Sequence, residues 1–479
     1  MAESYVSFKD TSGDSLSHIP EELLHFIRRD TYSLLVKGFA GTGKTTLALT
    51  ILNVLGIKNN FFYISTRTSP KQLFQYYPWL KDLVVKSKPR GTSLDRGYEA
   101  ISSFEDARLD EPESLFERIT NQLMDIKSPI IIIDSWDAIA SFMDREARLN
   151  NERVLQTWRE RAGAKLIFIS EQPNDITLEF LVDGIVELKQ RFYKNVKIRQ
   201  IFLQKLRGTP IKRPSYLYTL ENGIFHSFVP YQPVKFEPQK GGAAAEVSAL
   251  SGGDDIIKTG YSTLDSLLGS GFQKKDLVLL ELGSHVNMTI AMIFLQRIVS
   301  SFISGGNPVL LFPVNWLEPS SILNFFEAFL PAGKKSLFKI LWAGKPYKII
   351  SNNIISPSKK NESSCQLLAA LVKMKQRHRD KLLLNIMYAE AIQNIHGAGK
   401  MRNRTKNMLS SIMSRADLSI VVLTRSQEDI LEVVSELSNI HLRFMIIKDT
   451  LFLQSLAPSS NLYSVLLDTQ SQMNLKALV

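Results

Sequence analysis

The residues of this chain best suited to chemistry form a glycine-rich stretch, GFAGTGKTT, at positions 38–46. Its three glycines let the backbone take positive φ angles and come close to a ligand. The stretch follows a short apolar run, LLVK at 34–37, and precedes the apolar helical pattern LALTILNVL at 47–55. A strand, then G-x-x-x-x-G-K-T, then a helix is the order typical of a phosphate-binding loop. A glycine-rich turn with a chance lysine is the alternative, and the matching context disfavours it.

Each position of this loop has an expected role. Lys44 is expected to reach the β- and γ-phosphates of ATP, and the Thr45 hydroxyl to ligate Mg²⁺. Backbone N–H groups and the helix N-terminus would hold the remaining phosphate oxygens. The expected nucleotide-binding residues are Gly38, Phe39, Ala40, Gly41, Thr42, Gly43, Lys44, Thr45 and Thr46.

A second candidate lies at the end of an apolar run. Asp134 closes IIIID at 130–134, and an acid at the end of a strand in such sheets lies at the ligand crevice. We expect Asp134 to hold Mg²⁺ together with Thr45, directly or through water. A helix-capping aspartate is the alternative.

The whole chain sets broad limits. Its 479 residues suggest two to four domains, and its single cysteine, Cys365, allows no intramolecular disulfide. No apolar run approaches ~18 residues and the first residues are polar, so we expect a cytoplasmic protein without a membrane partner. A formal net charge of +11 permits an anionic partner such as nucleic acid.

An internal repeat organises the chain. A Pro-, Gly- and Ala-rich stretch at 229–255 reads as a linker between residues 1–228 and 256–479. The first half carries strand patterns at 61–65, 129–140, 164–173 and 198–208, with helical patterns between them. The second half repeats this plan. Alternating strands and helices predict an α/β fold in each half, with a mostly parallel sheet flanked by helices.

The layout resembles the tandem RecA/KaiC-like core of the KaiC family. The stretch TGYSTLDSLLGSGFQKKDLVLL at 259–280 is similar to the approach to the phosphate loop in that family. The first half, with STRTSPKQLFQYYPWL at 65–80 and RPSYLYTLENG at 213–223, resembles more closely the GvpD family of archaeal gas-vesicle regulatory proteins. This resemblance implies an ATP-binding regulatory protein of RecA/KaiC type.

The resemblance also suggests catalytic residues. KaiC-like proteins place a Lys and an Arg on a late strand, facing the nucleotide of a neighbouring subunit, and Lys205 and Arg207 in KLRG occupy these positions. Two basic residues on a solvated face are the alternative. Such ATPases carry adjacent glutamates after the second strand, but this chain has Arg67 and Thr68 there. An arginine cannot act as a base, so Glu171 is the expected substitute and we expect slow hydrolysis.

The second half is expected to be degenerate. Its loop aligns as LGSHVNMT at 282–289, in which Met288 replaces the lysine and only Thr289 is retained. The acid-tipped strand aligns with Asn385 in place of aspartate, and the two cationic positions align with Ser455 and Ala457.

Three basic clusters stand out. They are Lys373, Lys375, Arg377, Arg379 and Lys381; Lys400, Arg402, Arg404 and Lys406; and Arg191, Lys194, Lys197 and Arg199. Solvated helix faces or an anionic partner would both explain them. The sequence contains no zinc finger and no RNP-type motif, so specific DNA reading is not expected.

Three hypotheses follow for the function. The leading one is a nucleotide-dependent switch, resembling GvpD, that acts on a transcriptional regulator and hydrolyses ATP slowly. The second is an oligomeric ATPase resembling KaiC or the recombinases, acting on protein or DNA as a homo-oligomer. The third is a DNA-binding accessory protein with non-specific, salt-sensitive binding.

Overall fold

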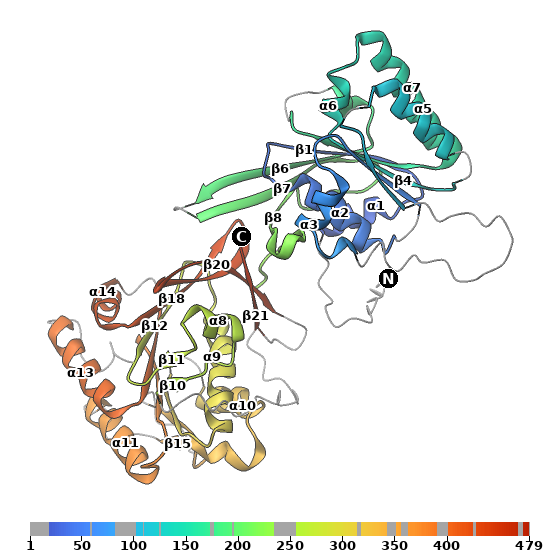
Figure 1. Ribbon diagram of the computed structural model, residues 1–479. Helices are drawn as coiled ribbons and strands as arrows, with labels where there is room; N and C mark the ends of the chain where they lie inside the picture. The colour runs from blue at the N-terminus through green and yellow to red at the C-terminus, as the bar shows by residue number, and fades with distance from the viewer. Residues whose placement is uncertain are drawn as a thin grey trace. The chain divides into compact units, whose positions relative to one another are not determined.

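The computed structural model describes residues 19–57, 60–81, 102–108, 110–123, 126–172, 177–193, 196–233, 255–313, 318–342, 351–355, 363–389, 401–424, 428–467 and 473–478. The chain divides into unit 1, residues 1–229 with 478–479, and unit 2, residues 230–477. Most of the expected linker, 234–254, lies outside the described residues. Each unit is an α/β body built around one large sheet (Figure 1).

Unit 1 contains a nine-stranded sheet in the order β3-β2-β4-β5-β1-β6-β7-β8-β9. Neighbours from β3 to β6 pair in parallel, and neighbours from β6 to β9 pair antiparallel. The strands are β1 (Tyr32–Gly38), β2 (Phe61–Ser65), β3 (Ser102–Asp106), β4 (Ile130–Asp134), β5 (Lys165–Ser170), β6 (Gly184–Tyr193), β7 (Val196–Leu206), β8 (Ser215–Thr219) and β9 (His226–Ser227).

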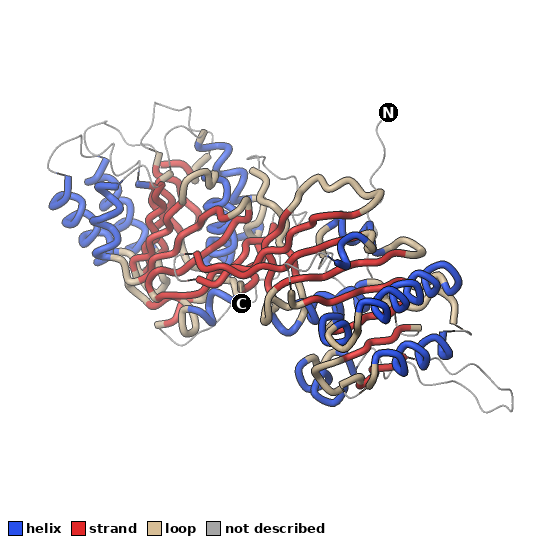
Figure 2. The backbone as a smooth tube through the Cα atoms, turned by 90° about the horizontal axis from the view of Figure 1, so that it is seen from above, coloured by secondary structure: helices blue, strands red, loops and turns tan. Residues whose placement is uncertain are grey.

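Helices cover both faces of this sheet, as the continuous apolar runs in β2 and β4 require (Figures 1 and 2). One apolar layer packs α1, α2 and α3 against the sheet, and the other packs α5, α6 and α7. The helices are α1 (Glu21–Ile27), α2 (Lys44–Val54), α3 (Pro70–Tyr76), α5 (Pro112–Leu123), α6 (Trp136–Ala140) and α7 (Arg145–Ala162), with short 3-10 turns η1 (Thr177–Phe180) and η2 (Glu221–Gly223).

Unit 2 repeats this topology in a ten-stranded sheet of order β15-β14-β13-β16-β17-β12-β18-β19-β20-β21. The strands are β12 (Leu277–Leu282), β13 (Val309–Phe312), β14 (Phe338–Leu341), β15 (Ile354–Ile355), β16 (Leu384–Tyr388), β17 (Leu418–Thr424), β18 (Ile440–Ile447), β19 (Thr450–Ala457), β20 (Ser459–Leu467) and β21 (Met473–Ala477). A separate antiparallel pair joins β10 (Ile256–Ile257) to β11 (Phe272–Gln273).

The unit 2 sheet also has helices on both faces (Figure 2). One layer packs α8 (Ser262–Leu267), α9 (Met288–Ser304) and α10 (Pro319–Glu327), and the 3-10 turn η3 (Ala332–Leu337) follows α10. The other packs α11 (Ser363–Arg377), α13 (Met401–Arg415) and α14 (Glu428–Leu437). The strand order β14-β13-β16-β17-β12-β18-β19-β20 matches β3-β2-β4-β5-β1-β6-β7-β8, so the tandem RecA/KaiC-like fold expected from the sequence repeat is confirmed.

A buried ionic cluster pins β18 to β12 in unit 2. Glu281, only 1% exposed, accepts hydrogen bonds from His441 Nε2 at 2.8 Å and from Arg443 Nε at 2.7 Å. Burial by itself would raise the pKa of Glu281, but the two hydrogen bonds outweigh it and the pKa lies below its usual value.

We expect Arg443→Ala to destabilise unit 2 by roughly 2 kcal/mol, because it leaves Glu281 buried with one partner fewer. Guanidinium unfolding followed by circular dichroism measures this, with the exposed Lys274→Ala as control. Because the pKa of Glu281 is lowered on folding, the contribution of the cluster is present above the unfolded pKa and is lost as pH falls through the folded pKa. A loss of stability that did not shrink in acid would contradict this account.

Candidate phosphate-binding site

The loop between β1 and α2 has the shape of a phosphate cradle, and two of its glycines are sterically required. A Cβ at Gly38 would lie 2.4 Å from the Leu188 carbonyl oxygen of β6. A Cβ at Gly43, where φ is +91°, would lie 2.7 Å from Leu220 Cδ1. Gly41, with φ of +77°, faces open space instead. The loop is therefore confined by β6 at Gly38 and by the Leu220 side chain at Gly43, and is open in the middle.

The N-terminus of α2 is left without a side-chain cap. Gly43 is the N-cap residue and has no side chain to accept a hydrogen bond from the first helical N–H groups. The Thr42 hydroxyl instead donates to the Phe39 carbonyl at 2.8 Å, and the buried Tyr218 hydroxyl donates to the Thr42 carbonyl. Such an uncapped helix start is a ready site for an anion.

Lys44 is the first residue of α2, and its side chain is only 5% exposed. Its Nζ donates to the Phe39 carbonyl at 3.0 Å and lies 4.0 Å from Glu171 Oε1. Burial lowers the pKa of Lys44, and the carboxylates of Glu171 and Asp134 oppose that shift. A bound phosphate would supply the close counter-charge that this ammonium group lacks.

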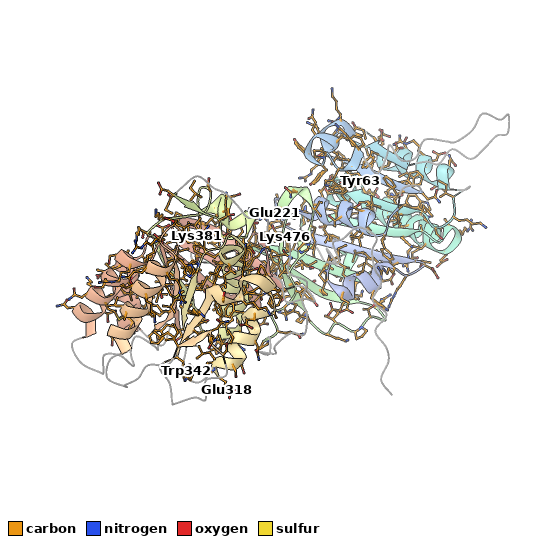
Figure 3. The ribbon with its side chains drawn as sticks, turned by 90° about the horizontal axis from the view of Figure 1, so that it is seen from below. Tyr63, Glu221, Glu318, Trp342, Lys381 and Lys476 are labelled. Atoms are coloured by element: carbon orange, nitrogen blue, oxygen red, sulfur yellow. The ribbon has the colours of Figure 1, made fainter. Side chains whose placement is uncertain are left out.

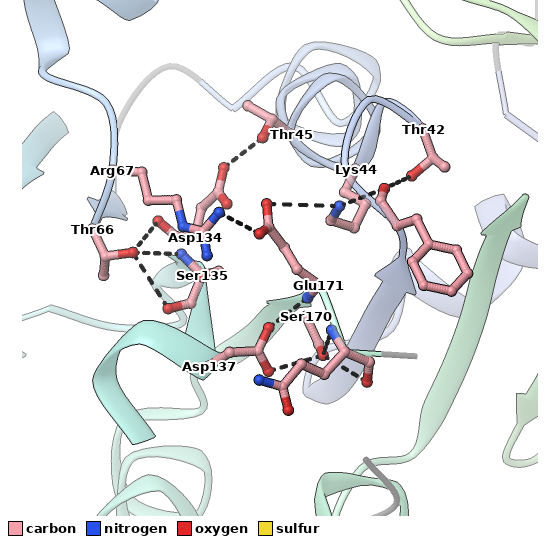
Figure 4. Close-up of polar contacts among 12 residues, drawn as sticks. Thr42, Lys44, Thr45, Thr66, Arg67, Asp134, Ser135, Asp137, Ser170 and Glu171 are labelled. Carbon is pink, nitrogen blue, oxygen red and sulfur yellow. Dashed lines mark hydrogen bonds and ion pairs between the residues drawn. The ribbon is translucent and has the colours of Figure 1, made fainter. Parts of the chain in front are cut away.

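Asp134 ends β4 beside the loop, as the sequence predicted (Figure 4). Its Oδ2 accepts hydrogen bonds from Thr45 Oγ1 at 2.6 Å and from the Tyr63 hydroxyl. Burial raises the pKa of Asp134, while these two hydrogen bonds and the charge of Lys44 oppose the shift. Tyr63 is fully buried among the packed side chains of unit 1 (Figure 3), and the sequence analysis did not identify it.

Glu171, which follows β5, is held at the loop from two sides (Figure 4). Its carboxylate forms an ion pair with Arg67, which follows β2. Its backbone N–H donates to Asp137 Oδ2 of α6, and the neighbouring Ser170 Oγ donates to Asp137 Oδ1 at 3.0 Å. The sequence analysis missed Asp137, because nothing local shows that α6 returns to the end of β5.

Three further residues of the expected nucleotide-binding set are Phe39, Thr46 and Ala40. Phe39 contributes its carbonyl to the contacts above, while its side chain is 64% exposed. Thr46 Oγ1 lies 3.0 Å from the Tyr77 hydroxyl and packs inward from the loop. Ala40 is exposed.

Lys205 and Arg207 lie away from the phosphate loop, which follows the end of β1. Lys205 pairs with Ile185, which pairs with Leu35 in the middle of β1. The Arg207 N–H donates to the Asp183 carbonyl, and the Asp183 N–H donates to the Ser33 carbonyl near the start of β1. Lys205 Nζ donates to the carbonyls of Glu179 and Val182, at 2.9 and 2.7 Å. Arg207 is paired with Asp183 at 3.3 Å. Neither cation contacts the loop of its own chain.

The helix start that follows the matching loop of unit 2 is capped from within the chain. Asn287 is the N-cap of α9, and its Oδ1 accepts from the Thr289 N–H at 3.0 Å and from the Thr289 hydroxyl at 3.1 Å. Met288 stands where Lys44 stands in unit 1, since each is the first residue of its helix. The helix start that is open in unit 1 is therefore satisfied from within the chain.

The expected counterparts in unit 2 of Asp134 and of the two cations are wrong in register. Asp134 pairs with Ile169 in unit 1, and Tyr388 pairs with Val422 at the matching place in unit 2, so Tyr388 rather than Asn385 replaces the acid. Asn385 lies near the start of β16 and is fully buried.

The cationic positions shift in the same way. Ala457 pairs with His441 as Lys205 pairs with Ile185, so Ala457 and Ser459, rather than Ser455 and Ala457, replace the two cations. Both hairpins carry a register shift at this place. The sequence alignment that set Ser455 and Ala457 against Lys205 and Arg207 does not follow the strand pairing. Unit 2 still has no basic residue at either position.

The basic clusters are partly neutralised. Lys375 forms an ion pair at 2.5 Å with Asp417, and Lys406 forms one at 2.6 Å with Glu436. Lys194 and Lys400 lie outside the described residues. Within the described parts of the chain, no helix is long and apolar enough to cross a membrane, and no group of three His, Cys, Asp or Glu residues could hold a metal ion.

We expect Gly38→Ala to destabilise unit 1 by about 2 kcal/mol, because its Cβ would meet backbone atoms of β6 that cannot move away cheaply. Gly41→Ala is the matched control: nothing lies within 4 Å of its Cβ, so only the positive φ angle costs stability, by about 1 kcal/mol. Thermal unfolding of both variants measures the difference. Equal losses would show that β6 does not confine the loop.

Comparisons with known proteins agree with this geometry. Residues 24–204 match the family described as GvpD gas vesicle protein, P-loop domain. Protein GvpD2 of Halobacterium salinarum is 25% identical over 337 residues, which cover 67% of this chain and 66% of that protein. Protein GvpD1 of the same organism is 26% identical over 324 residues, covering 64% and 58%.

The similarity extends to a second group. The circadian clock oscillator protein KaiC of Thermostichus vulcanus is 24% identical over 294 residues, covering 57% of this chain and 51% of that protein. The alignments thus span between half and two thirds of the length of these relatives. The phosphate loop of unit 1 lies inside the matched family domain. Residues 24–204 therefore form a P-loop domain of the GvpD type, and the chain is similar to GvpD and KaiC proteins of the RecA/KaiC-like group of P-loop ATPases.

Proposed function

We propose that this protein is an ATP-dependent regulatory switch, in which unit 1 binds Mg·ATP and the bound nucleotide controls a protein partner. The observation that carries the proposal is the contrast between the two helix starts. Gly43 leaves α2 open to phosphate, whereas Asn287 caps α9 from within. Only one of the two repeated units therefore has a helix start suited to a nucleotide.

The donor set of unit 1 fits a magnesium ion. Thr45 Oγ1 and Asp134 Oδ2 lie 2.6 Å apart, and hydroxyl and carboxylate oxygens are ligands that Mg²⁺ prefers. These two residues would hold the ion, and Lys44 with the loop N–H groups would hold the phosphates. A bound Mg²⁺ would neutralise negative charge on the phosphates. It would also displace the Thr45 and Tyr63 hydrogen bonds from Asp134, or share the carboxylate with them.

Slow hydrolysis follows from the state of Glu171. If Glu171 orients the attacking water, its carboxylate must be free to do so, but this carboxylate is paired with Arg67 and lies 4.0 Å from Lys44. A switch benefits from this, since slow turnover prolongs the ATP-bound state.

Regulation of a partner fits the second unit. Unit 2 keeps the sheet and both helix layers but has Met288, Tyr388 and Ala457 at the chemical positions. A folded body without phosphate chemistry suits contact with another protein. Because the relatives are named as GvpD proteins, the partner we propose is a regulator of gas-vesicle genes.

An oligomeric ATPase remains the second candidate, and one observation favours it. The side-chain contacts that the structure describes for Lys205 and Arg207 are with residues 179–183 and not with their own phosphate loop, so a role at a nucleotide would place them at the site of another copy. Assembly would then complete the site.

The two candidates differ in how turnover depends on protein concentration. For the switch we expect tight ATP binding and slow turnover that is independent of concentration and unchanged in Arg207→Ala. Lys44→Ala should weaken ATP binding by at least about tenfold, because it removes a charged hydrogen-bond donor. Isothermal calorimetry and a steady-state phosphate assay measure both, with the exposed Lys71→Ala as control. Fast turnover that rises with concentration and falls by about 10³-fold in Arg207→Ala would establish the oligomeric ATPase instead.

We expect Arg67→Ala to raise the turnover rate by about tenfold or more, because it releases Glu171 to orient water. The Arg67 side chain is 57% exposed, so the substitution should leave the fold intact. Adding Glu171→Gln should cancel the gain, and Arg161→Ala, an exposed arginine of α7, should have no effect. If Arg67→Ala instead weakened ATP binding without any gain in rate, Arg67 would be a phosphate ligand and not a restraint on Glu171.

A further inference from the structure

Unit 1 contains a cavity of about 600 Å³ that the nucleotide site does not use. It opens beyond the ends of β2, β3 and β4, between the start of α5, α6 and the start of α7. Its apolar lining includes Ala107, Leu115, Ile139 and Met143. This volume lies within the range of pockets that bind ligands or anchoring side chains.

The mouth of the cavity combines an exposed aromatic ring with unpaired negative charge. The Phe142 side chain lines the cavity and is 79% exposed, which is unusual for so large an apolar group. Glu111 and Glu113 also line it, are exposed, and form no ion pair with any residue that the structure describes.

Two other charged lining residues that the structure describes are already paired. Arg108 is paired with Asp106 at 2.6 Å, and Asp110 is paired with Arg118 at 2.7 Å. Among the described side chains that line the cavity, the unpaired charge is therefore negative, in a protein whose formal net charge is +11. Carboxylates repel phosphate, so this surface disfavours nucleic acid.

We propose that this cavity is the docking site for a basic segment of the partner protein, with an aromatic or aliphatic anchor flanked by lysine or arginine. The anchor would enter the apolar cavity and pack against Phe142, which gives affinity. The flanking cations would pair with Glu111 and Glu113 at the mouth, which gives orientation and selectivity. The identity of the occupant as the regulated partner rests on the proposed function; the docking chemistry does not.

The same cavity touches the nucleotide site through both walls. Thr66 lines it and hydrogen-bonds to the Asp134 carbonyl and the Ser135 N–H, and the next residue, Arg67, holds the Glu171 carboxylate. On the other wall, Ala138 of α6 follows Asp137, which accepts the Glu171 N–H.

Glu171 therefore contacts a residue next to each wall of the cavity, and its Oε1 lies 4.0 Å from Lys44 Nζ (Figure 4). An occupant that moves either wall changes the surroundings of the phosphate-loop lysine. By linkage, nucleotide binding changes the affinity for the occupant by the same factor.

The test uses the full chain and a short fluorescein-labelled peptide in which lysine and arginine flank a central phenylalanine. Fluorescence anisotropy gives its dissociation constant with and without a non-hydrolysable ATP analogue. We expect binding that weakens with salt, and that weakens about tenfold when the basic residues of the peptide become glutamine. The Glu111→Gln/Glu113→Gln variant should lose a similar factor, and Phe142→Ala about fivefold. All three side chains are exposed, so these variants should fold.

One control and three contrary results make the test decisive. Glu160→Gln, an exposed acid near the far end of α7, should change peptide affinity less than twofold. Peptide binding that ignores the Glu111, Glu113 and Phe142 substitutions would overturn the docking site. Loss of self-association in these variants, measured by sedimentation, would show that the occupant is a second copy. Competition by single-stranded DNA at this site would also overturn the assignment.

Nucleotide coupling is measured separately. The ATP analogue should change peptide affinity more in wild type than in Arg67→Ala, which cuts one of the two links to Glu171. Peptide binding without ATP binding would refute the proposed function but leave the docking site standing, and ATP binding without peptide binding would do the reverse.

Discussion

Parallel strand pairing places the ends of β1, β2, β4 and β5 at one edge of the unit 1 sheet, and every feature of the nucleotide site depends on that edge. Lys44 follows β1, Asp134 ends β4 and Glu171 follows β5. Three charges from distant parts of the chain thus converge without any local pattern linking them. At this edge of the sheet the positive charges of Lys44 and Arg67 offset the negative charges of Asp134 and Glu171.

The two units differ at a small number of positions around the start of the helix that follows the central strand. Both have the same strand order and a loop of equal length before the helix. Replacing an N-cap glycine by Asn287 supplies the helix start with its own acceptor, and replacing the lysine by Met288 removes the charge. A lysine on the central strand, Lys37, is matched by Glu281, which forms its own buried cluster with His441 and Arg443. At these positions unit 2 therefore has either an uncharged side chain, Met288, or a charge paired within the chain, Glu281.

In unit 1 the contacts between charged side chains extend beyond the phosphate loop. Arg67 follows β2, and its guanidinium pairs with the Glu171 carboxylate. Arg67 and Asp137 also adjoin Thr66 and Ala138, which line the cavity, and the coupling that we propose rests on these neighbours. This arrangement suits the nucleotide-dependent switch that we propose.

The sequence by itself determined the phosphate loop, the strand patterns at 61–65 and 130–134, the repeat and the degeneracy of the second half. Those features are local: glycine spacing, a helix-start lysine and apolar runs keep their meaning without a partner strand. Only the tertiary structure decided that Tyr63 contacts Asp134, that Asp137 and Arg67 contact Glu171, and that Tyr388 and Ala457 stand at the matching positions of unit 2. These facts depend on strand register and on contacts between distant segments, and sequence similarity did not reveal the register in which β7 pairs with β6 and β19 pairs with β18.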